Sequence, residues 1–283
     1  MRKFCLHTYD RTRSFDLNGT KALATEPSGL GNGFQTSYKE SEQGNYLTNV
    51  KPKFDPIILK IYFNADGTSG YLNYKGFMAF LSLCGMSKFI FEYNDGITDK
   101  YCDVVLKSIP KSEINSDGVF METLTLERQT YWYEVINDEF AFSNIDETPI
   151  FPLPFPFGFQ GSTFTNERTV ENLFFASAPI LITISGQILT DLRIYVKNEN
   201  GDTVSEISIS EDLPTGSVVH IDPVTKKITI TDAHGVVTNG YGITDKTKQS
   251  FLYLPQGKYI VGANIISGAT GKIELSIKRY LFD

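Results

Sequence analysis

Apolar side chains recur at helical spacing between Asn73 and Gly85. The face that they form consists of Tyr74, Phe77, Phe80, Leu81 and Cys84. Asn73 is suited to cap the N-terminus of such a helix, and Gly85 is suited to follow its C-terminus in a left-handed conformation. A helix of about three turns is marginally stable by itself in water. We therefore expect it to be held by packing against strands.

Short apolar runs bounded by turn residues follow this helix and predict strands. The runs are residues 88–93, 101–107 and 119–128, with turns at 94–96 and 115–118. The simplest arrangement is one helix laid across an antiparallel sheet. Its core is expected to contain four side chains of the helix and the single tryptophan, namely Tyr74, Phe77, Phe80, Leu81 and Trp132.

The segment before the helix combines one apolar run, residues 57–63, with much turn chemistry. Residues 64–67 form a turn without the acidic ladder of a calcium loop. Residues 27–33 are glycine-rich, but their spacing is not that of a dinucleotide fingerprint and no helix follows to hold a phosphate. Residues 36–49 are polar and predict an exposed arm or loop.

The character of the chain changes after residue 137. Proline alternates with large apolar residues between 150 and 159, and this pattern fits neither a helix nor a central strand. We expect an extended strip whose side chains lie on neighbouring structure, and a ligand-binding aromatic strip is the alternative. The expected division is therefore an N-terminal domain (1–137), a connecting segment (138–178) and a C-terminal domain (179–283).

The C-terminal domain consists of β-branched runs separated by turns. Eight runs are recognisable: residues 180–185, 192–196, 203–209, 217–222, 227–231, 250–254, 258–262 and 272–280. Short strands at regular spacing without a helix predict an antiparallel β-sandwich. The fold class is thus mainly β, with a β-rich N-terminal domain carrying one α-helix on an antiparallel sheet, followed by the sandwich.

Composition narrows the function classes. The net charge is −7, which does not resemble the basic footprint of a nucleic-acid binder. No apolar run is long enough to span a bilayer, and the N-terminus lacks the apolar core of a secretory signal. The three cysteines, Cys5, Cys84 and Cys102, lack the spacing of a disulfide framework or a zinc site.

Catalytic patterns are missing from the sequence. None of His7, His220 and His234 has a partner at metal-ligand spacing. His220 and Asp222 share a strand face, but no nucleophile accompanies them. A sandwich glycosidase brings distant carboxylates together, so sequence alone leaves that class open. We expect no enzyme activity, no cofactor and no metal.

Several segments together resemble the distal tail protein (Dit) family of tailed phages, mainly those that infect Gram-positive bacteria. The resemblance begins with Pro27, Gly29, Leu30 and Gly31, and continues through the strand 57–63 and the aromatic helix. It extends over residues 101–104, 111–113 and 125–133, and then over 222–231 and 250–257 of the sandwich. The proline-rich strip 150–159 departs from the Tyr-rich linker typical of the family.

The resemblance implies an N-terminal belt domain that assembles with itself into a six-fold ring, and a galectin-like sandwich outside it. Such a ring sits at the distal end of the tail tube, between the tail-tube protein and the tail-tip or tail-associated protein. It serves as the hub of a baseplate with receptor-binding proteins, and DNA passes through its channel without specific binding. The chain would then be a virion protein of phage or prophage, assembled in the host cytoplasm, that makes no membrane contact.

We expect one surface for contact between subunits of the ring, and the alternative function would need another for sugar binding. The ring interface is expected to include Pro27, Gly29, Leu30 and Gly31, together with the polar arm 36–49. The alternative function is a carbohydrate-binding module in host adsorption, because sandwiches of this type often bind glycans. Sugar binding needs exposed aromatic faces and convergent polar groups, for which the sandwich offers Tyr195, Tyr241, Tyr253, Tyr259 and Tyr280.

Overall fold

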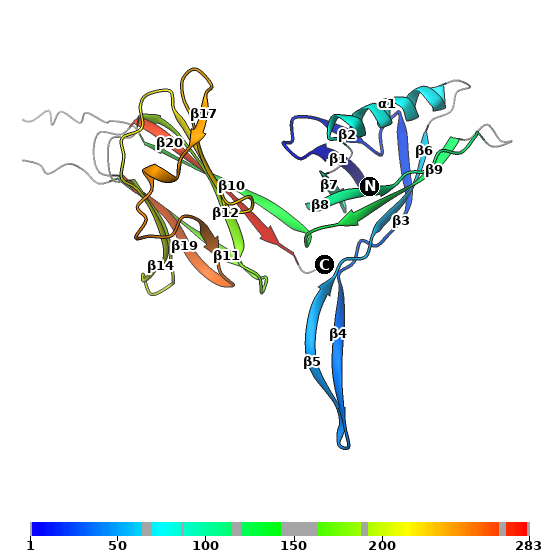
Figure 1. The fold of residues 1–283 in the computed structure, drawn as a ribbon, viewed down its shortest axis with the longest axis horizontal. Helices are drawn as coiled ribbons and strands as arrows, with labels where there is room; N and C mark the ends of the chain where they lie inside the picture. The colour runs from blue at the N-terminus through cyan, green and yellow to red at the C-terminus, as the bar shows by residue number, and fades with distance from the viewer. Residues whose placement is uncertain are drawn as a thin grey trace, which may run out of the picture. The chain divides into compact units, whose positions relative to one another are not determined.

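The computed structural model describes residues 2–63, 69–85, 88–114, 120–142, 164–187, 192–265 and 270–281 (Figure 1). Its internal contacts form two compact units. The first unit comprises Met1–Glu134 and Leu281–Asp283, and the second comprises Val135–Tyr280. The expected turns at 64–67 and 115–118 and the proline-rich strip 150–159 lie outside the described residues.

Among its described residues, the first unit contains nine strands and the first residues of a tenth. They are β1 (Lys3–Thr8), β2 (Ser14–Asp16), β3 (Ala22–Ser28), β4 (Gly33–Ser41), β5 (Gly44–Lys53), β6 (Ile57–Phe63), β7 (Lys88–Asn94), β8 (Asp99–Ser108), β9 (Phe120–Arg128) and β10 (Tyr133–Phe142). Antiparallel pairing gives the order β2-β1-β7-β8-β9-β6-β3. Tyr133, at the start of β10, also pairs with Tyr101 of β8.

The helix α1 (Ser69–Leu83) covers one face of this sheet. It begins at Ser69, five residues before Tyr74, the first residue after the predicted cap, so Asn73 lies inside the helix instead of capping it. The additional turn is held by tertiary contacts, because the Tyr71 ring packs 5.0 Å from the Phe120 ring and its hydroxyl donates to Glu113. The expected C-terminal signal is confirmed, since Gly85 has φ +58.

Aromatic rings of α1 pack against aromatic rings of the sheet and of β2. Phe77 is fully buried, with its ring centroid 4.8 Å from that of Phe15 and 5.8 Å from that of Phe63. Tyr74 meets the Phe63 ring edge-on at 5.4 Å. Such ring pairs add to the free energy gained from burying apolar area. The predicted helix on an antiparallel sheet is therefore confirmed.

The polar segment 36–49 is not an irregular loop but most of a long β-hairpin. Among the strands that the structure describes, β4 and β5 pair only with each other, and nearly all of their residues are exposed. In Figure 1 they extend away from the rest of the first unit as a separate two-stranded ribbon. The sequence suggested an arm or a loop because neither strand has a buried face, and therefore neither has an apolar alternation.

The second unit is an antiparallel sandwich of two sheets. Its strands are the remainder of β10, β11 (Phe164–Asn172), β12 (Ala178–Gln187), β13 (Leu192–Lys197), β14 (Thr203–Ile209), β15 (Val218–Asp222), β16 (Lys227–Thr231), β17 (Val237–Asn239), β18 (Leu252–Leu254), β19 (Gly257–Ile265) and β20 (Thr270–Tyr280), and a short 3₁₀ helix spans Tyr241–Ile243. One sheet has the order β17-β16-β15-β12-β20-β10, with β18 also on β12, and the other has the order β11-β19-β13-β14.

The core of the sandwich consists of Ile, Leu, Val and Ala side chains from both sheets together with Phe140, and the aliphatic side chains are those that the β-branched runs predict. All eight expected strands are present. The structure adds β17 and β11, and β11 lies inside the expected connecting segment 138–178. β11 escaped detection because Val170 and Asn172 are its only buried side chains from Thr165 onward, so it has no apolar alternation.

Candidate functional site

The glycine-rich loop between β3 and β4 has a fixed backbone shape. Gly29 has φ +73, and a Cβ added to it would lie 1.9 Å from the carbonyl oxygen of Pro56. An L-amino acid side chain is excluded there both by the conformation and by the contact. Gly31 has no atom within 4 Å of the corresponding position, so its neighbourhood is open. Only the first of these two glycines is therefore required by the fold.

Two side chains from the end of β9 and the segment after it hold this loop. The buried guanidinium of Arg128 donates to the Gly31 carbonyl at 2.8 Å and to Asn32 Oδ1 at 2.7 Å. The indole Nε1 of Trp132 donates to the Leu30 carbonyl at 2.6 Å. Hydrogen bonds from a charged donor are the stronger ones in proteins. The loop is thus fixed to the core and not free to move as a tether.

The Arg128 guanidinium also contacts two aromatic rings. It lies 5.1 Å from the centroid of Trp132 and 5.4 Å from that of Phe54, which follows β5. Burial lowers the pKa of Arg128, while the nearby Cys102 and Asp55 act in the opposite direction. A guanidinium remains charged at neutral pH even so. The buried Arg128 guanidinium therefore contacts the chain on both sides of the hairpin: the glycine-rich loop before β4 and Phe54 after β5.

Sequence reasoning did not assign this role to Arg128, although a usable signal was present. In β9 the buried side chains are those of alternate residues, from Phe120 through Leu124 and Leu126. The same parity places Arg128 on the buried side. An arginine on the apolar face of a strand needs several acceptors, and the carbonyls of a nearby glycine-rich loop are suited to supply them.

The hairpin that this loop carries exposes large apolar side chains. They are Phe34 (40% exposed), Tyr38 (59%), Tyr46 (53%), Leu47 (56%) and Val50 (47%). Tyr38 and Leu47 lie directly opposite each other on the two strands. Contiguous exposed apolar residues on a soluble protein typically mark an interaction surface. The braced loop and this hairpin together form the candidate site.

The residues expected at the ring interface lie in or beside the loop. Pro27 is half-buried in β3, Leu30 is half-buried against the core of the first unit, and Gly31 is exposed. The residues expected in the helix–sheet core all lie in one buried cluster, namely Tyr74, Phe77, Phe80, Leu81 and Trp132. The Trp132 indole connects the two groups, because it is buried in that cluster and bonds to the loop.

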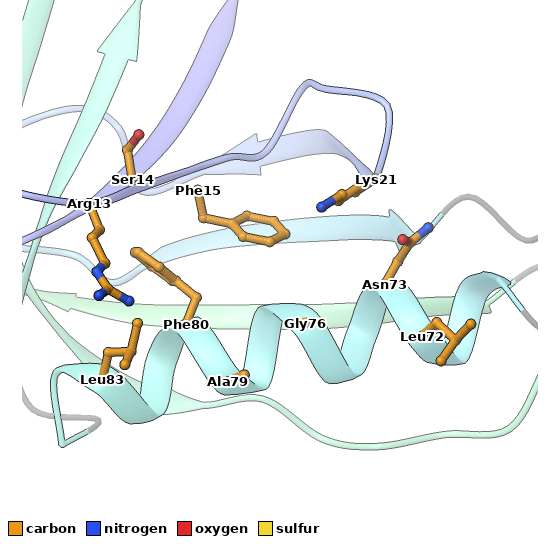
Figure 2. Close-up of a pocket in the computed structure, with 10 residues that line it drawn as sticks. All are labelled: Arg13, Ser14, Phe15, Lys21, Leu72, Asn73, Gly76, Ala79, Phe80 and Leu83. Carbon is orange, nitrogen blue, oxygen red and sulfur yellow. The ribbon is translucent and has the colours of Figure 1, made fainter.

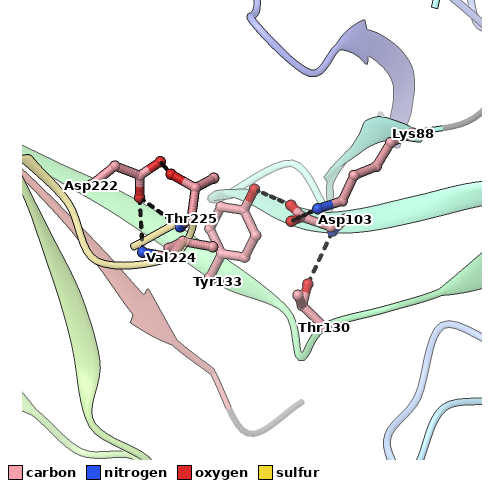
Figure 3. A network of polar contacts seen from close by, with 7 residues as sticks. All are labelled: Lys88, Asp103, Thr130, Tyr133, Asp222, Val224 and Thr225. Atoms are coloured by element: carbon pink, nitrogen blue, oxygen red, sulfur yellow. Dashed lines mark hydrogen bonds and ion pairs between the residues drawn. The ribbon is translucent and has the colours of Figure 1, made fainter. Parts of the chain in front are cut away.

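A polar network lies near the junction of β8 and β10 (Figure 3). The buried Tyr133 hydroxyl donates to Asp103 Oδ1 at 2.9 Å, and Lys88 Nζ lies 3.8 Å from Asp103 Oδ2. The Asp103 amide donates to Thr130 Oγ1 at 3.0 Å. Burial, together with the charge of Asp103, raises the pKa of Tyr133 far above its usual range. The network satisfies buried polar groups and stabilises the first unit.

A groove of about 680 Å³ lies between α1 and the β2 region (Figure 2). Phe15, Phe80 and Leu83 give it an apolar character, and Arg13 and Lys21 supply two cations. The described residues that line it include no His, Cys, Asp or Glu. The groove therefore combines apolar side chains with two cations, which is the chemistry of a docking surface.

The tyrosines on which sugar binding would depend are mostly covered. Tyr195 is buried with its hydroxyl donating to Glu167 Oε1 at 2.7 Å, and Tyr253 and Tyr259 are half-buried. Tyr280 is also half-buried, whereas Tyr241 is 37% exposed.

Within the described part of the chain, no helix has the length and apolarity needed to cross a membrane.

Comparison with known protein families identifies a domain in the first unit. The family model described as "Distal tail protein, N-terminal domain" matches residues 3–129, which include the loop, the hairpin, α1 and Arg128. A search of curated proteins gave no match.

Two solved structures share the fold over nearly the whole chain. A chain of the phage P2 baseplate in its activated conformation with Ca has 16% identity and a TM-score of 0.71, and the alignment covers 100% of this chain and 99% of that one. The SPP1 Dit protein, described as a paradigm of the hub adsorption apparatus in phages that infect Gram-positive bacteria, has 12% identity, a TM-score of 0.55 and coverage of 96% and 98%. Residues 3–129 of the chain thus carry a distal tail protein N-terminal domain, and the chain as a whole shares its fold with the SPP1 Dit protein and with a chain of the phage P2 baseplate.

Proposed function

We propose that this chain is the hub subunit of a phage tail, and that six copies form a ring at the distal end of the tail tube. The ring links the tail-tube protein to the tail tip or baseplate. The exposed hairpin β4–β5 is the observation that carries this proposal. Tyr38, Tyr46, Leu47 and Val50 of the hairpin are 47–59% exposed in their own unit, so a neighbouring molecule is the natural cover.

Ring formation places physical demands that the first unit meets. A closed ring needs a heterologous interface, in which one patch of each subunit binds a different patch of the next. A rigid, projecting element is suited to this because little conformational entropy is lost when it binds. Arg128 and Trp132 supply that rigidity at the base of the hairpin. We assign the interface to Pro27, Gly29, Leu30, Gly31 and the hairpin.

The remaining partners follow from this position. The ring lies beneath the tail-tube protein and above the tail-tip protein, and it carries receptor-binding or other baseplate proteins on its outside. DNA passes through the central channel without specific contacts, in agreement with the net charge of −7. Assembly takes place in the host cytoplasm, and the mature location is the virion tail. The second unit is a sandwich carried by the ring.

The test combines the purified full chain with assembled tails. Electron microscopy of the protein at increasing concentration is expected to show six-fold rings, and antibody labelling is expected to mark the distal end of the tail on its axis. The double variant Tyr38→Ser/Leu47→Ser removes one exposed cross-strand pair from the hairpin. We expect it to remain folded but to form far fewer rings at equal concentration.

A matched control removes exposed apolar residues elsewhere. Val236 and Val237 are 55% and 62% exposed in the second unit, and the variant Val236→Ser/Val237→Ser is expected to assemble as the unmodified chain does. Equal assembly of the hairpin variant and this control would contradict the assigned interface. Antibody label away from the tail axis would contradict the hub function itself.

A further inference from the structure

Three side chains with metal-binding chemistry share one face of the sheet in the first unit. Cys5 and His7 are two residues apart on β1, and Glu92 of β7 lies directly opposite Cys5 in the antiparallel register. Opposite residues in such a pair point to the same face, as do residues two apart on one strand. Phe4, Leu6 and Phe91 are buried in the core on the other face. The three polar side chains therefore converge on the face away from α1.

Their ligand atoms are close together. His7 Nε2 lies 2.5 Å from Glu92 Oε2, and the Cys5 Sγ, His7 nitrogen and Glu92 oxygen atoms all lie within 4.8 Å of one another. All three residues are half-buried, and the side chains of His7 and Glu92 are 20% and 22% exposed. The cluster is thus sheltered from most of the solvent but remains accessible to a small ion.

The charge of the surroundings favours a cation. Glu92 is one of the two carboxylates that act on Cys5, and the other is Asp16, which lies opposite Cys5 on β2. Two carboxylates beside a thiol disfavour an additional negative charge, whereas a bound divalent ion would be attracted by both and would stabilise the thiolate.

We propose that Cys5, His7 and Glu92 form a binding site for a divalent transition metal, with Zn²⁺ as the preferred ion. One sulfur, one nitrogen and one oxygen donor suit Zn²⁺ and Co²⁺, whereas Ca²⁺ and Mg²⁺ prefer oxygen ligands alone. With three protein ligands, the fourth tetrahedral position is open to water. This site is independent of the hub function and of the hairpin interface.

Binding requires only small side-chain movements. Tetrahedral Zn²⁺ with bond lengths of about 2.0–2.3 Å holds its ligand atoms about 3.3–3.8 Å apart. The 2.5 Å contact between His7 and Glu92 would lengthen by about 1 Å, and the thiol would approach by a similar amount. The bound ion would join β1 to β7 through their side chains. Because it binds the folded state, it would raise the thermal stability of the first unit.

The test uses the untagged full chain after treatment with a chelator. Titration with Co²⁺ is expected to produce a thiolate-to-cobalt charge-transfer band and intense tetrahedral d–d bands, which one equivalent of Zn²⁺ then removes. Cys5→Ser is expected to lose the charge-transfer band. His7→Gln is expected to weaken Zn²⁺ affinity at least about tenfold. Loss of a residue that only supports a metal ligand already costs about tenfold or more, and His7 is proposed as a ligand itself. Ca²⁺ and Mg²⁺ are expected to cause no change.

The controls alter the same residue types outside the cluster. Cys84→Ser and His220→Gln are expected to bind as the unmodified chain does, since Cys84 lies after α1 and His220 is exposed on β15. Circular dichroism checks that each variant is folded. Glu92→Gln is a third cluster variant, and it tests the site without altering β1. A cobalt spectrum of the unmodified chain without a thiolate band would overturn the proposal. So would equal affinity in the cluster variants and the controls.

Discussion

At the scale of single residues, backbone conformation and buried polar contacts decide what each position of the loop tolerates. Gly29 is left-handed and faces the Pro56 carbonyl, whereas Gly31 faces open space. The Gly31 carbonyl is nevertheless an acceptor for Arg128. The loop therefore depends on the backbone atoms of both residues but on the missing side chain of only one.

We expect Gly29→Ala to lower the free energy of unfolding of the first unit by more than about 2 kcal/mol. A left-handed L-residue costs about 1–2 kcal/mol, and the contact with Pro56 adds to that cost. Gly31→Ala is expected to stay within about 0.5 kcal/mol of the unmodified protein. Urea unfolding followed by the fluorescence of Trp132, the single tryptophan, measures both. Equal effects at the two glycines would contradict the described loop.

Tyr133 predicts a loss of stability at high pH. Its pKa is raised above the ordinary value of 10.0 in the folded state, by burial and by Asp103. Unfolding therefore releases a proton above about pH 10, so the contribution is complete below that pH and is lost as the pH rises. One proton corresponds to a slope of about 1.4 kcal/mol per pH unit.

The variant Tyr133→Phe isolates this contribution. We expect it to be about 1 kcal/mol less stable at pH 7, because the hydrogen bond to Asp103 is lost. Above pH 10 its stability should fall less steeply than that of the unmodified chain. Urea unfolding across pH 8–11 gives both slopes, and identical slopes would show that Tyr133 is not shielded as described.

At the scale of elements, tertiary contacts modify what local patterns predict. The apolar repeat of α1 located its buried face. The helix begins earlier, at Ser69, because the Tyr71 ring packs on Phe120 of β9 and its hydroxyl donates to Glu113. The strands of the hairpin and β11 have few buried side chains, so no apolar alternation identified them. Periodicity detects burial, and elements without a buried face escape it.

The two sides of α1 are expected to respond differently to truncation. Phe77→Ala removes a ring that is fully buried against Phe15 and Phe63, and should cost about 3–5 kcal/mol. Leu72 is 66% exposed, and Leu72→Ala should change the stability by less than about 0.5 kcal/mol. Thermal unfolding by circular dichroism compares them. A comparable loss in both variants would mean that α1 presents a different face to the sheet.

At the scale of the whole molecule, the two units have separate hydrophobic cores with no residue in common. The chain crosses from the first unit to the second within β10 and returns after β20. The Leu281 amide donates to the Trp132 carbonyl at 2.8 Å, and its side chain packs on the first core. The first unit is therefore completed by residues from the far end of the chain.

We expect residues 135–280 to fold alone with a single cooperative urea transition, because their core is complete. Residues 1–134 alone lack Leu281, so they should be about 1 kcal/mol less stable than the same unit in the full chain. Circular dichroism follows the unfolding of residues 135–280, and Trp132 fluorescence follows the unfolding of residues 1–134. A broad, non-cooperative transition of residues 135–280 would show that the sandwich needs the rest of the chain.

Residue spacing along the chain was enough to predict the elements that bury a face, namely the aromatic helix, the apolar strands of both units and the antiparallel sandwich. This was possible because burial imposes a spacing of 3.6 or 2 residues that is visible without coordinates. Contacts between groups far apart in the chain could not be predicted in this way. Arg128 and Trp132 bond to a loop about a hundred residues earlier, and Cys5 and His7 meet Glu92 across two strands. Strand register brings these groups together, and register depends on packing throughout the sheet and not on local spacing.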